Sequence, residues 1–248
     1  MTVVATADGS HATVEFFLDC SCPWSYLALG RVREAAIRTS AQVIYRPVLV
    51  GDVLERANPG FPASRIDPVT ARARYQAKDL GDWARYCGLT LRHPEPWPIR
   101  AEWAMRGLVV ANRTSMAGRD QSADKGSERT SGNRQSRRRQ DQAVAYLTAV
   151  FEALFRDNQP VADLEVVEAI ATSAGFDAAE FARQIRQPDT LAIVQDNAVD
   201  LVARGGFGTP SFLVGTDLFF GNDRMPLVEL ALARQGGMSL TMPGAHGA

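Results

Sequence analysis

The order of apolar patterns along the chain limits the possible folds more than any other feature of the sequence. Near each end, short runs of aromatic and β-branched residues, typical of buried strands, stand beside segments whose apolar residues recur three and four positions apart, as in helices. In chain order these segments are residues 13–19, 25–38, 42–49, 211–215, 217–221 and 225–235. The first three predict a strand–helix–strand unit with parallel strands, and the last three predict a hairpin followed by a helix.

Between these two units the chain carries mainly helical patterns. Apolar residues recur at helical spacing and stop near Gly, Pro or Asn in residues 68–89, 101–111, 143–157, 163–175, 178–186 and 189–205. We therefore predict an α/β fold in which residues 12–60 and 206–236 meet in one sheet domain, while residues 61–205 form an all-helical insertion domain.

One segment inside the insertion has a different composition. Residues 112–142 are polar, rich in Ser, Gly and Arg, and almost free of large apolar side chains. Such a segment buries too little surface to offset its ordering entropy, so we predict a disordered loop. Its basic triplet, residues 137–139, could contact nucleic acid or an acidic partner, but a solvated charged loop is the more frequent case. The net charge of −1 also argues against a general nucleic-acid-binding protein.

The apolar runs and the cysteines indicate the cellular compartment in which the protein is expected. No run of about 18 apolar residues, the length that spans a membrane, is present. The N-terminus lacks the basic start and the apolar core of a signal peptide. The 3 cysteines do not make a disulfide framework, so we expect a cytoplasmic protein without a membrane partner. A single Cys-x-Cys without a second pair of ligands cannot complete a tetrahedral zinc site, and no metal is expected.

Cys22 stands where a predicted strand gives way to a predicted helix, and Pro23 follows it. A thiol in the first turn of a helix lies near unpaired backbone N–H groups and the positive end of the helix dipole, which favour the thiolate and lower the thiol pKa. Proline is well tolerated at the first helical position. Cys22 is therefore predicted to be reactive, whereas Cys20 fits a small buried side chain at the strand end. Asp19 is more often a capping carboxylate than a catalyst.

Thr209 and Pro210 come directly before the predicted strand 211–215. Because proline is disfavoured within central strands, this dipeptide fits either a cis-proline turn at a strand entrance or a proline on an edge strand. The Cys-Pro helix start near the other end of the chain favours the cis-proline turn.

Together these features resemble the DsbA-like thioredoxin superfamily, and within it the branch that holds 2-hydroxychromene-2-carboxylate isomerase and kappa-class glutathione transferase. The matching motifs are FFLDCSCPWSYLALG, residues 16–30, and FGTPSFLVGTDLFFGNDRMPLVELAL, residues 207–232. The resemblance covers nearly the whole chain apart from the N-terminal tail and residues 112–142. It implies a thioredoxin-like fold, βαβ…ββα, with a helical insertion, and it implies glutathione as the cofactor.

The resemblance also assigns roles to individual residues. Cys22 stands in the place of the family's catalytic serine, whose role is to hold the glutathione sulfur as a thiolate by hydrogen bonding. The Thr209 backbone would pair with the cysteinyl part of glutathione as an added strand, and Asn222 with Asp223 would bind the γ-glutamyl end. The full set of implied glutathione-binding residues is Asn58, Arg72 (with Arg74 as the alternative register), Thr209, Pro210, Asn222 and Asp223.

The chain departs from the family pattern at Cys22 itself. A cysteine can form a disulfide, which a serine cannot, and CPWS resembles the CPWC of the redox-active branch with its second cysteine replaced by Ser25. Without that partner the site cannot run the usual dithiol cycle, and a ring between Cys20 and Cys22 would be strained. Trp97 and Pro98 match an apolar wall of the family's site, although the polar residue expected nearby is arginine, at position 100, in this chain.

Three functions stay open on this basis. The first is a glutathione-dependent isomerase of the 2-hydroxychromene-2-carboxylate type, acting on a small aromatic-degradation intermediate, and the two end motifs favour it. The second is a monothiol oxidoreductase or kappa-type glutathione transferase that uses Cys22, favoured by cysteine in the place of serine. The third is a non-catalytic binding module with the same fold. The family allows a homodimer, on which the sequence is silent.

Overall fold

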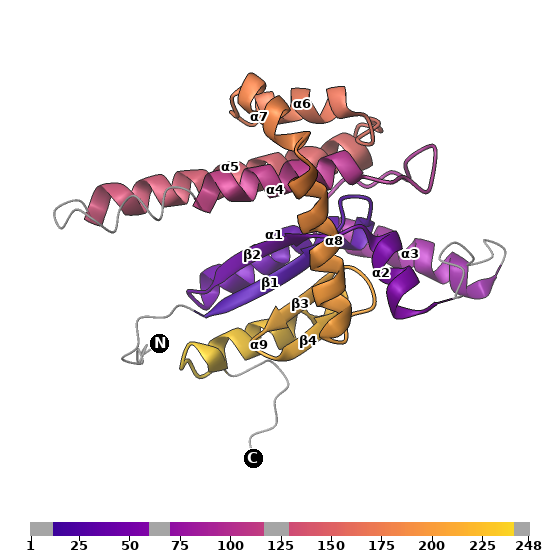
Figure 1. The fold of residues 1–248 in the computed structure, drawn as a ribbon. Helices are drawn as coiled ribbons and strands as arrows, with labels where there is room; N and C mark the ends of the chain where they lie inside the picture. The colour runs from indigo at the N-terminus through magenta and orange to yellow at the C-terminus, as the bar shows by residue number, and fades with distance from the viewer. Residues whose placement is uncertain (1–11, 60–69, 117–128, 241–248) are drawn as a thin grey trace, which may run out of the picture.

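The structure, a computed structural model, describes residues 12–59, 70–116 and 129–240, with side chains described for 12–59, 70–114 and 142–240. Its centre is a four-stranded sheet in the order β2-β1-β3-β4 (Figure 1). β1 (Thr13–Leu18) runs parallel to β2 (Gln42–Pro47) and antiparallel to β3 (Ser211–Val214), which forms a hairpin with β4 (Asp217–Phe220). Strands from the two ends of the chain therefore share one sheet, as the sequence predicts.

The helices follow the predicted segments, with two additions, α2 and a short 3-10 helix. They are α1 (Pro23–Arg38), α2 (Val50–Ala57), α3 (Ala71–Tyr86), α4 (Glu102–Met116), α5 (Arg129–Phe155), α6 (Leu164–Ser173), α7 (Ala178–Ile185), α8 (Pro188–Ala203), the 3-10 helix η2 (Asn222–Arg224) and α9 (Met225–Gln235). The sequence does not predict α2, because Val53 is its only fully buried residue and one buried side chain leaves no helical period to detect. No helix in the described part of the chain is long and apolar enough to cross a membrane.

The prediction of a disordered loop over residues 112–142 is wrong at both of its ends. Residues 112–116 continue α4 and residues 129–142 form the first half of α5, while residues 117–128, and the side chains of the basic triplet, lie outside what the structure describes. Low apolar content limits packing, but a helix that a packed segment has already nucleated extends at little cost. Arg and Gln, frequent in this segment, are good helix formers.

The side chains of β1 alternate between two cores, one on each face of the sheet. Phe16 points to the face covered by α1 and α9, and its ring stacks on Phe212 of β3 with centroids 4.9 Å apart. Phe17 points to the other face, where it packs in a second cluster with Val53 of α2 and Leu201 of α8. Burial of each such aromatic side chain stabilises the fold by roughly 1.5–3 kcal/mol. The sheet is thus a middle layer packed on both faces, and this packing fixes the positions of the strand ends.

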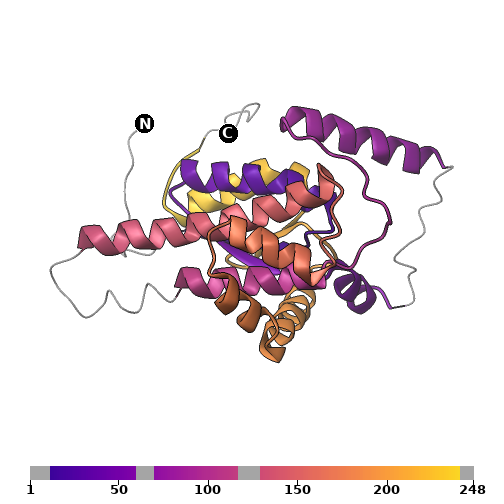
Figure 2. The same cartoon turned by 90° about the horizontal axis from the view of Figure 1, so that it is seen from above.

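The inserted helices pack onto the sheet. α4 and α5 lie side by side in both views (Figures 1 and 2). One continuous core contains Phe16 of the sheet, Leu108 of α4, Phe151 of α5 and Phe181 of α7. The sheet and the insertion share this core, and the predicted domain limits, 12–60 with 206–236 and 61–205, stay a prediction.

Candidate active site

Cys22 is the residue from which α1 starts. It is the N-cap of the helix, in an extended conformation (φ −92°, ψ 113°), and Pro23 occupies the first turn. Its backbone N–H donates to the Asp19 carbonyl at 3.0 Å, and its own carbonyl accepts from the Ser25 N–H at 3.0 Å. The residue is 9% exposed. The thiol therefore lies at the start of the helix, as predicted, but is nearly enclosed.

The Thr209–Pro210 peptide bond is cis and lies against Cys22. The Cys22 thiol donates from Sγ to the Thr209 carbonyl oxygen over 3.3 Å, which joins two positions 187 residues apart in the chain. The Pro210 carbonyl accepts from the Gly221 N–H at 3.0 Å and so connects this turn to the end of β4. The cis-proline turn predicted at the entrance to β3 is confirmed, while its part in binding stays a prediction.

Asn222 and Asp223 follow β4 in η2. Gly221 before them has φ 103°, in the region that favours glycine. Asn222 is 2% exposed, and its Nδ2 has no hydrogen-bond partner among the described residues. Asp223 is exposed and pairs with Arg224, with 2.5 Å between Oδ2 and Nη1. An unpaired buried donor is costly, and an acceptor on a ligand would satisfy it.

Arg31 of α1 holds Asn222 in place, a contact that the sequence does not predict. Its Nη1 donates to the backbone carbonyl of Asn222 and, over 2.9 Å, to Asn222 Oδ1. The guanidinium carbon lies 4.6 Å from the centre of the Trp83 ring and 6.0 Å from that of Tyr86, both on α3. This contact spans 191 positions of sequence and leaves no local pattern that could reveal it.

Asn58 and Arg72, predicted to bind glutathione, lie at different places. Asn58 is the exposed C-cap of α2, and Arg72 is exposed in the first turn of α3, as is the alternative Arg74. No contact between described residues links Asn58 or Arg72 to Cys22, and residues 60–69, between the two helices, lie outside the described part. Their assignment stays a prediction.

The segment before α4 contains the predicted apolar wall. The Trp97–Pro98 bond is cis, and Trp97 is 41% exposed, with its ring centre 4.9 Å from that of His93. Arg100, which stands near the family's polar position, pairs through Nη1 with Asp52 Oδ1 of α2 at 3.0 Å. Arg100 thus ties this segment to α2.

Asp19 is a structural carboxylate, the role that the sequence favours. Oδ1 accepts from the Ser21 N–H and Oδ2 accepts from the Val50 N–H, each at 2.7 Å, and Val50 is the first residue of α2. Burial raises the pKa of this carboxyl, while the two backbone hydrogen bonds and the charge of Arg100 oppose the rise. Asp19 therefore fixes the start of α2 against the end of β1.

The pKa of the Cys22 thiol is raised, so the predicted lowering is wrong. Burial is the largest cause, and the charge of Asp19 adds to it, whereas hydrogen bonding from Thr209 and Ser25 lowers the pKa in part. The helix start does not compensate for enclosure, because burial disfavours the charged form. Among the described residues, Ser25 Oγ and Thr209 Oγ1 are buried without a hydrogen-bond partner, and a hydrogen bond from either side chain to the sulfur favours its ionised form. At neutral pH the thiol is protonated and can donate a hydrogen bond.

The raised pKa gives a testable pH profile. We expect the alkylation rate of Cys22 by iodoacetamide to keep rising above about pH 8.5, the ordinary thiol pKa, because the reactive thiolate forms only at higher pH. Ser25→Ala should move the profile further upward, since it removes a hydroxyl that lowers the Cys22 pKa. Peptide mapping by mass spectrometry across the pH series measures both. A plateau below the ordinary thiol pKa would contradict this account.

The other cysteines lie outside this arrangement. Cys20 is fully buried in the main core, which confirms the predicted packing role. Cys87, directly after α3, is half-buried, and all three thiols are free. Within the described residues, no three His, Cys, Asp or Glu side chains gather as a metal site would require.

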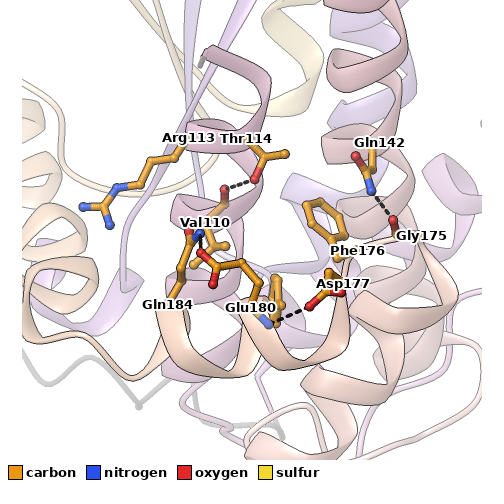
Figure 3. Close-up of a pocket in the computed structure, with 10 residues that line it drawn as sticks. Val110, Arg113, Thr114, Gln142, Gly175, Phe176, Asp177, Glu180 and Gln184 are labelled. Carbon is orange, nitrogen blue, oxygen red and sulfur yellow. Dashed lines mark hydrogen bonds between the residues drawn. The ribbon is translucent and has the colours of Figure 1, made fainter. Parts of the chain in front are cut away.

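A separate cavity of about 500 Å³ lies between α4, α5 and α7 (Figure 3). Its polar groups largely pair with one another: Gln142 Nε2 donates to the Gly175 carbonyl at 2.6 Å, and the Glu180 N–H donates to Asp177 Oδ1 at 2.8 Å. None of the residues predicted for the site lines it. This cavity therefore lies apart from the predicted site residues.

Comparison with known proteins agrees with this fold. The family profile of the DSBA-like thioredoxin domain matches residues 13–124 and 134–233. A protein of Sphingobium xenophagum named 2-hydroxychromene-2-carboxylate isomerase is 24% identical over 217 residues, which cover 88% of this chain and 96% of that protein. A solved structure of 2-hydroxychromene-2-carboxylate isomerase superposes with a TM-score of 0.69 at 23% identity, covering 90% of this chain and 95% of its own. The cytosolic disulfide reductase DsbM of Pseudomonas aeruginosa, solved with GSH, has a TM-score of 0.54 at 15% identity, covering 90% and 96%.

Proposed function

The chain belongs to the DsbA-like thioredoxin family, and from this premise we propose that it is a glutathione-dependent isomerase of the 2-hydroxychromene-2-carboxylate type. Relatives that carry this name match the chain over nearly its whole length. The substrate would be a small aromatic-degradation intermediate, and the catalytic residue Cys22.

The observation that carries this proposal is the hydrogen bond that the buried, protonated Cys22 thiol donates to the Thr209 carbonyl. A serine hydroxyl in the same place would donate in the same way. Because a thiol carries one proton, this donor would turn from the Thr209 carbonyl to the sulfur of a bound ligand, where it can stabilise a thiolate without ionising itself. The burial that raises the Cys22 pKa therefore suits a donor and works against a nucleophile.

Three of the predicted residues carry groups that suit a γ-glutamyl thiol ligand. The Thr209 backbone beside cis-Pro210 lies next to the sulfur, Asn222 presents a buried and unpaired Nδ2, and the exposed Asp223 carboxylate suits an ammonium group. Bound glutathione would supply a nucleophilic thiol that adds to the substrate and is released unchanged. Cys22 would hold that sulfur as a thiolate, and Thr209 with Asn222 would orient it.

The second candidate, a monothiol oxidoreductase, rests on the cysteine itself, because a thiol at position 22 can exchange disulfides where a serine cannot. Disulfide exchange needs the thiolate as nucleophile. The raised pKa of Cys22 makes this the weaker candidate.

An activity assay combined with intact-protein mass spectrometry tests the choice. The protein is mixed with 2-hydroxychromene-2-carboxylate, with and without reduced glutathione, and isomerisation is followed by absorbance. Parallel samples of wild type and Cys22→Ser are incubated with reduced and oxidised glutathione, and their intact masses are measured. We expect glutathione-dependent isomerisation and no stable adduct. One glutathione adduct on wild type, absent from Cys22→Ser, without isomerisation would support thiol exchange instead. If the protein shows no isomerase activity and binds no glutathione, the result would support the non-catalytic binding module.

A further inference from the structure

A cavity of about 640 Å³ opens along the middle of α1, on the side that faces α3, α5 and α9. α1 contacts both α5 and α9, and in Figure 1 it lies between them. The apolar part of the lining includes the buried Leu29 and Met225 and the half-buried Leu89, and the 76% exposed ring of Tyr86 stands at its edge. A volume of this size is ordinary for a small-molecule site, for which about 300–1,000 Å³ is usual.

The charges in this lining do not cancel. Arg38 binds Glu229 through two hydrogen bonds of 2.6 and 2.8 Å and lies 3.6 Å from Glu34, so both carboxylates of the lining already face the same cation. Arg31 donates to the neutral oxygens of Asn222, and Arg33 is half-buried. Among the described residues, no carboxylate comes within 4.0 Å of Arg31 or Arg33. A half-buried guanidinium without an anion favours a ligand that supplies one.

We propose that this cavity is a second binding site, for a small organic anion with a flat apolar body. The anionic group would lie at Arg33 and Arg31, and the apolar body would lie against Leu29, Leu89 and Met225 beneath the Tyr86 ring. An inorganic anion alone would leave these apolar walls uncovered, and a neutral aromatic compound would leave the two arginines without a counter-charge.

Arg31 gives the cavity a route to the candidate active site. The same guanidinium lines the cavity and binds Asn222, so an anion that draws Arg31 toward itself changes the orientation of Asn222. This consequence rests on the proposed function, because Asn222 is assigned there to glutathione. The shared Arg31 predicts that the ligand changes the affinity for glutathione by the same factor by which glutathione changes the affinity for the ligand. Binding in the cavity does not depend on it.

Cys87 provides a direct measurement, because its half-buried thiol lines the cavity. The full-length protein is alkylated with iodoacetamide at about pH 8.5 with increasing 2-naphthoate, and the modification of Cys22 and Cys87 is read separately by peptide mapping. At ten times its Kd, 2-naphthoate should slow Cys87 alkylation about tenfold, by mass action. Arg33→Gln should weaken this protection about tenfold, the loss expected for a charge-assisted contact. Arg85→Gln, which removes an exposed arginine of α3 that pairs with Asp82 outside the cavity, should leave it unchanged.

Each other outcome overturns the assignment. Unchanged Cys87 alkylation at millimolar 2-naphthoate would show that no such site exists. Equal protection by neutral 2-naphthalenemethanol, or equal protection of Arg33→Gln, would show that the arginines do not contribute to binding of the anionic group. Protection of Cys22 alone would place 2-naphthoate at the candidate active site instead. None of these readouts requires isomerase activity, so the cavity and the proposed function fail separately.

Discussion

Replacing Cys22 with alanine is expected to lower kcat/KM of the glutathione-dependent isomerisation by about 100- to 1,000-fold, whereas serine should keep it within about tenfold of wild type. The protonated Cys22 thiol already donates a hydrogen bond to the Thr209 carbonyl. A serine hydroxyl is also a donor and an alanine methyl is not, so the two variants separate donation from covalent sulfur chemistry. Steady-state kinetics with varied glutathione measure the effect, which should fall mainly on kcat if the donor acts on the reacting sulfur.

Cys20→Ala is the matched control for the loss of a thiol. Cys20 lies two positions away but is fully buried in the main core, so its replacement should cost some stability and leave kcat unchanged. Alanine at position 22 with full activity would remove Cys22 from the mechanism. Serine as inactive as alanine would show that the reaction needs a sulfur nucleophile, which favours thiol exchange.

The sequence predicts those parts of the fold that local patterns encode. Strand β1 alternates about Phe16 and Phe17, and α1 begins at the Cys22–Pro23 step, because residue type and spacing specify these features within a few positions. The cis bond before Pro210 is also predicted, although the local pattern allows an edge-strand proline as well and the Cys22–Pro23 helix start decides between the two. Cys20 is predicted as a packing residue and is fully buried.

The site chemistry is harder to predict because it depends on contacts between distant segments. The helix start of Cys22 predicts a lowered pKa, but burial of the thiol raises it, and the thiol is buried against Thr209, 187 positions along the chain. The hydrogen bond from Arg31 to Asn222 likewise joins two segments that share no sequence pattern. The resemblance places Asn58 and Arg72 in the site; the structure shows both exposed, one at the end of α2 and one at the start of α3, and their assignment stays a prediction. Residue identity gives the possible chemistry, and burial decides which protonation state is present.

Gly107→Ala is expected to destabilise the protein by about 3–5 kcal/mol and to lower Tm by about 10 °C. Gly107 lies on α4 where the buried ring of Tyr146 crosses it, and an added Cβ would come within 2.7 Å of Tyr146 Cζ and closer still to its hydroxyl oxygen. The ring cannot move without losing the 3.0 Å hydrogen bond from its hydroxyl to the Ala104 carbonyl. The new methyl group therefore costs both packing and a buried hydrogen bond.

Gly30→Ala is the matched control for this change, because a Cβ at Gly30, inside α1, meets nothing within 4 Å. It should stabilise the protein by about 0.5–1 kcal/mol, the usual gain of alanine over glycine in a helix. Tyr146→Phe removes the atom closest to the new methyl group, so in a Gly107→Ala background it should restore part of the lost stability, whereas alone it should cost about 1 kcal/mol. Thermal and denaturant unfolding of wild type, Gly107→Ala, Tyr146→Phe and the double variant measure the coupling between positions 107 and 146. Equal losses for Gly107→Ala with and without the tyrosine hydroxyl would show that the hydroxyl of Tyr146 is not the reason for glycine at this position.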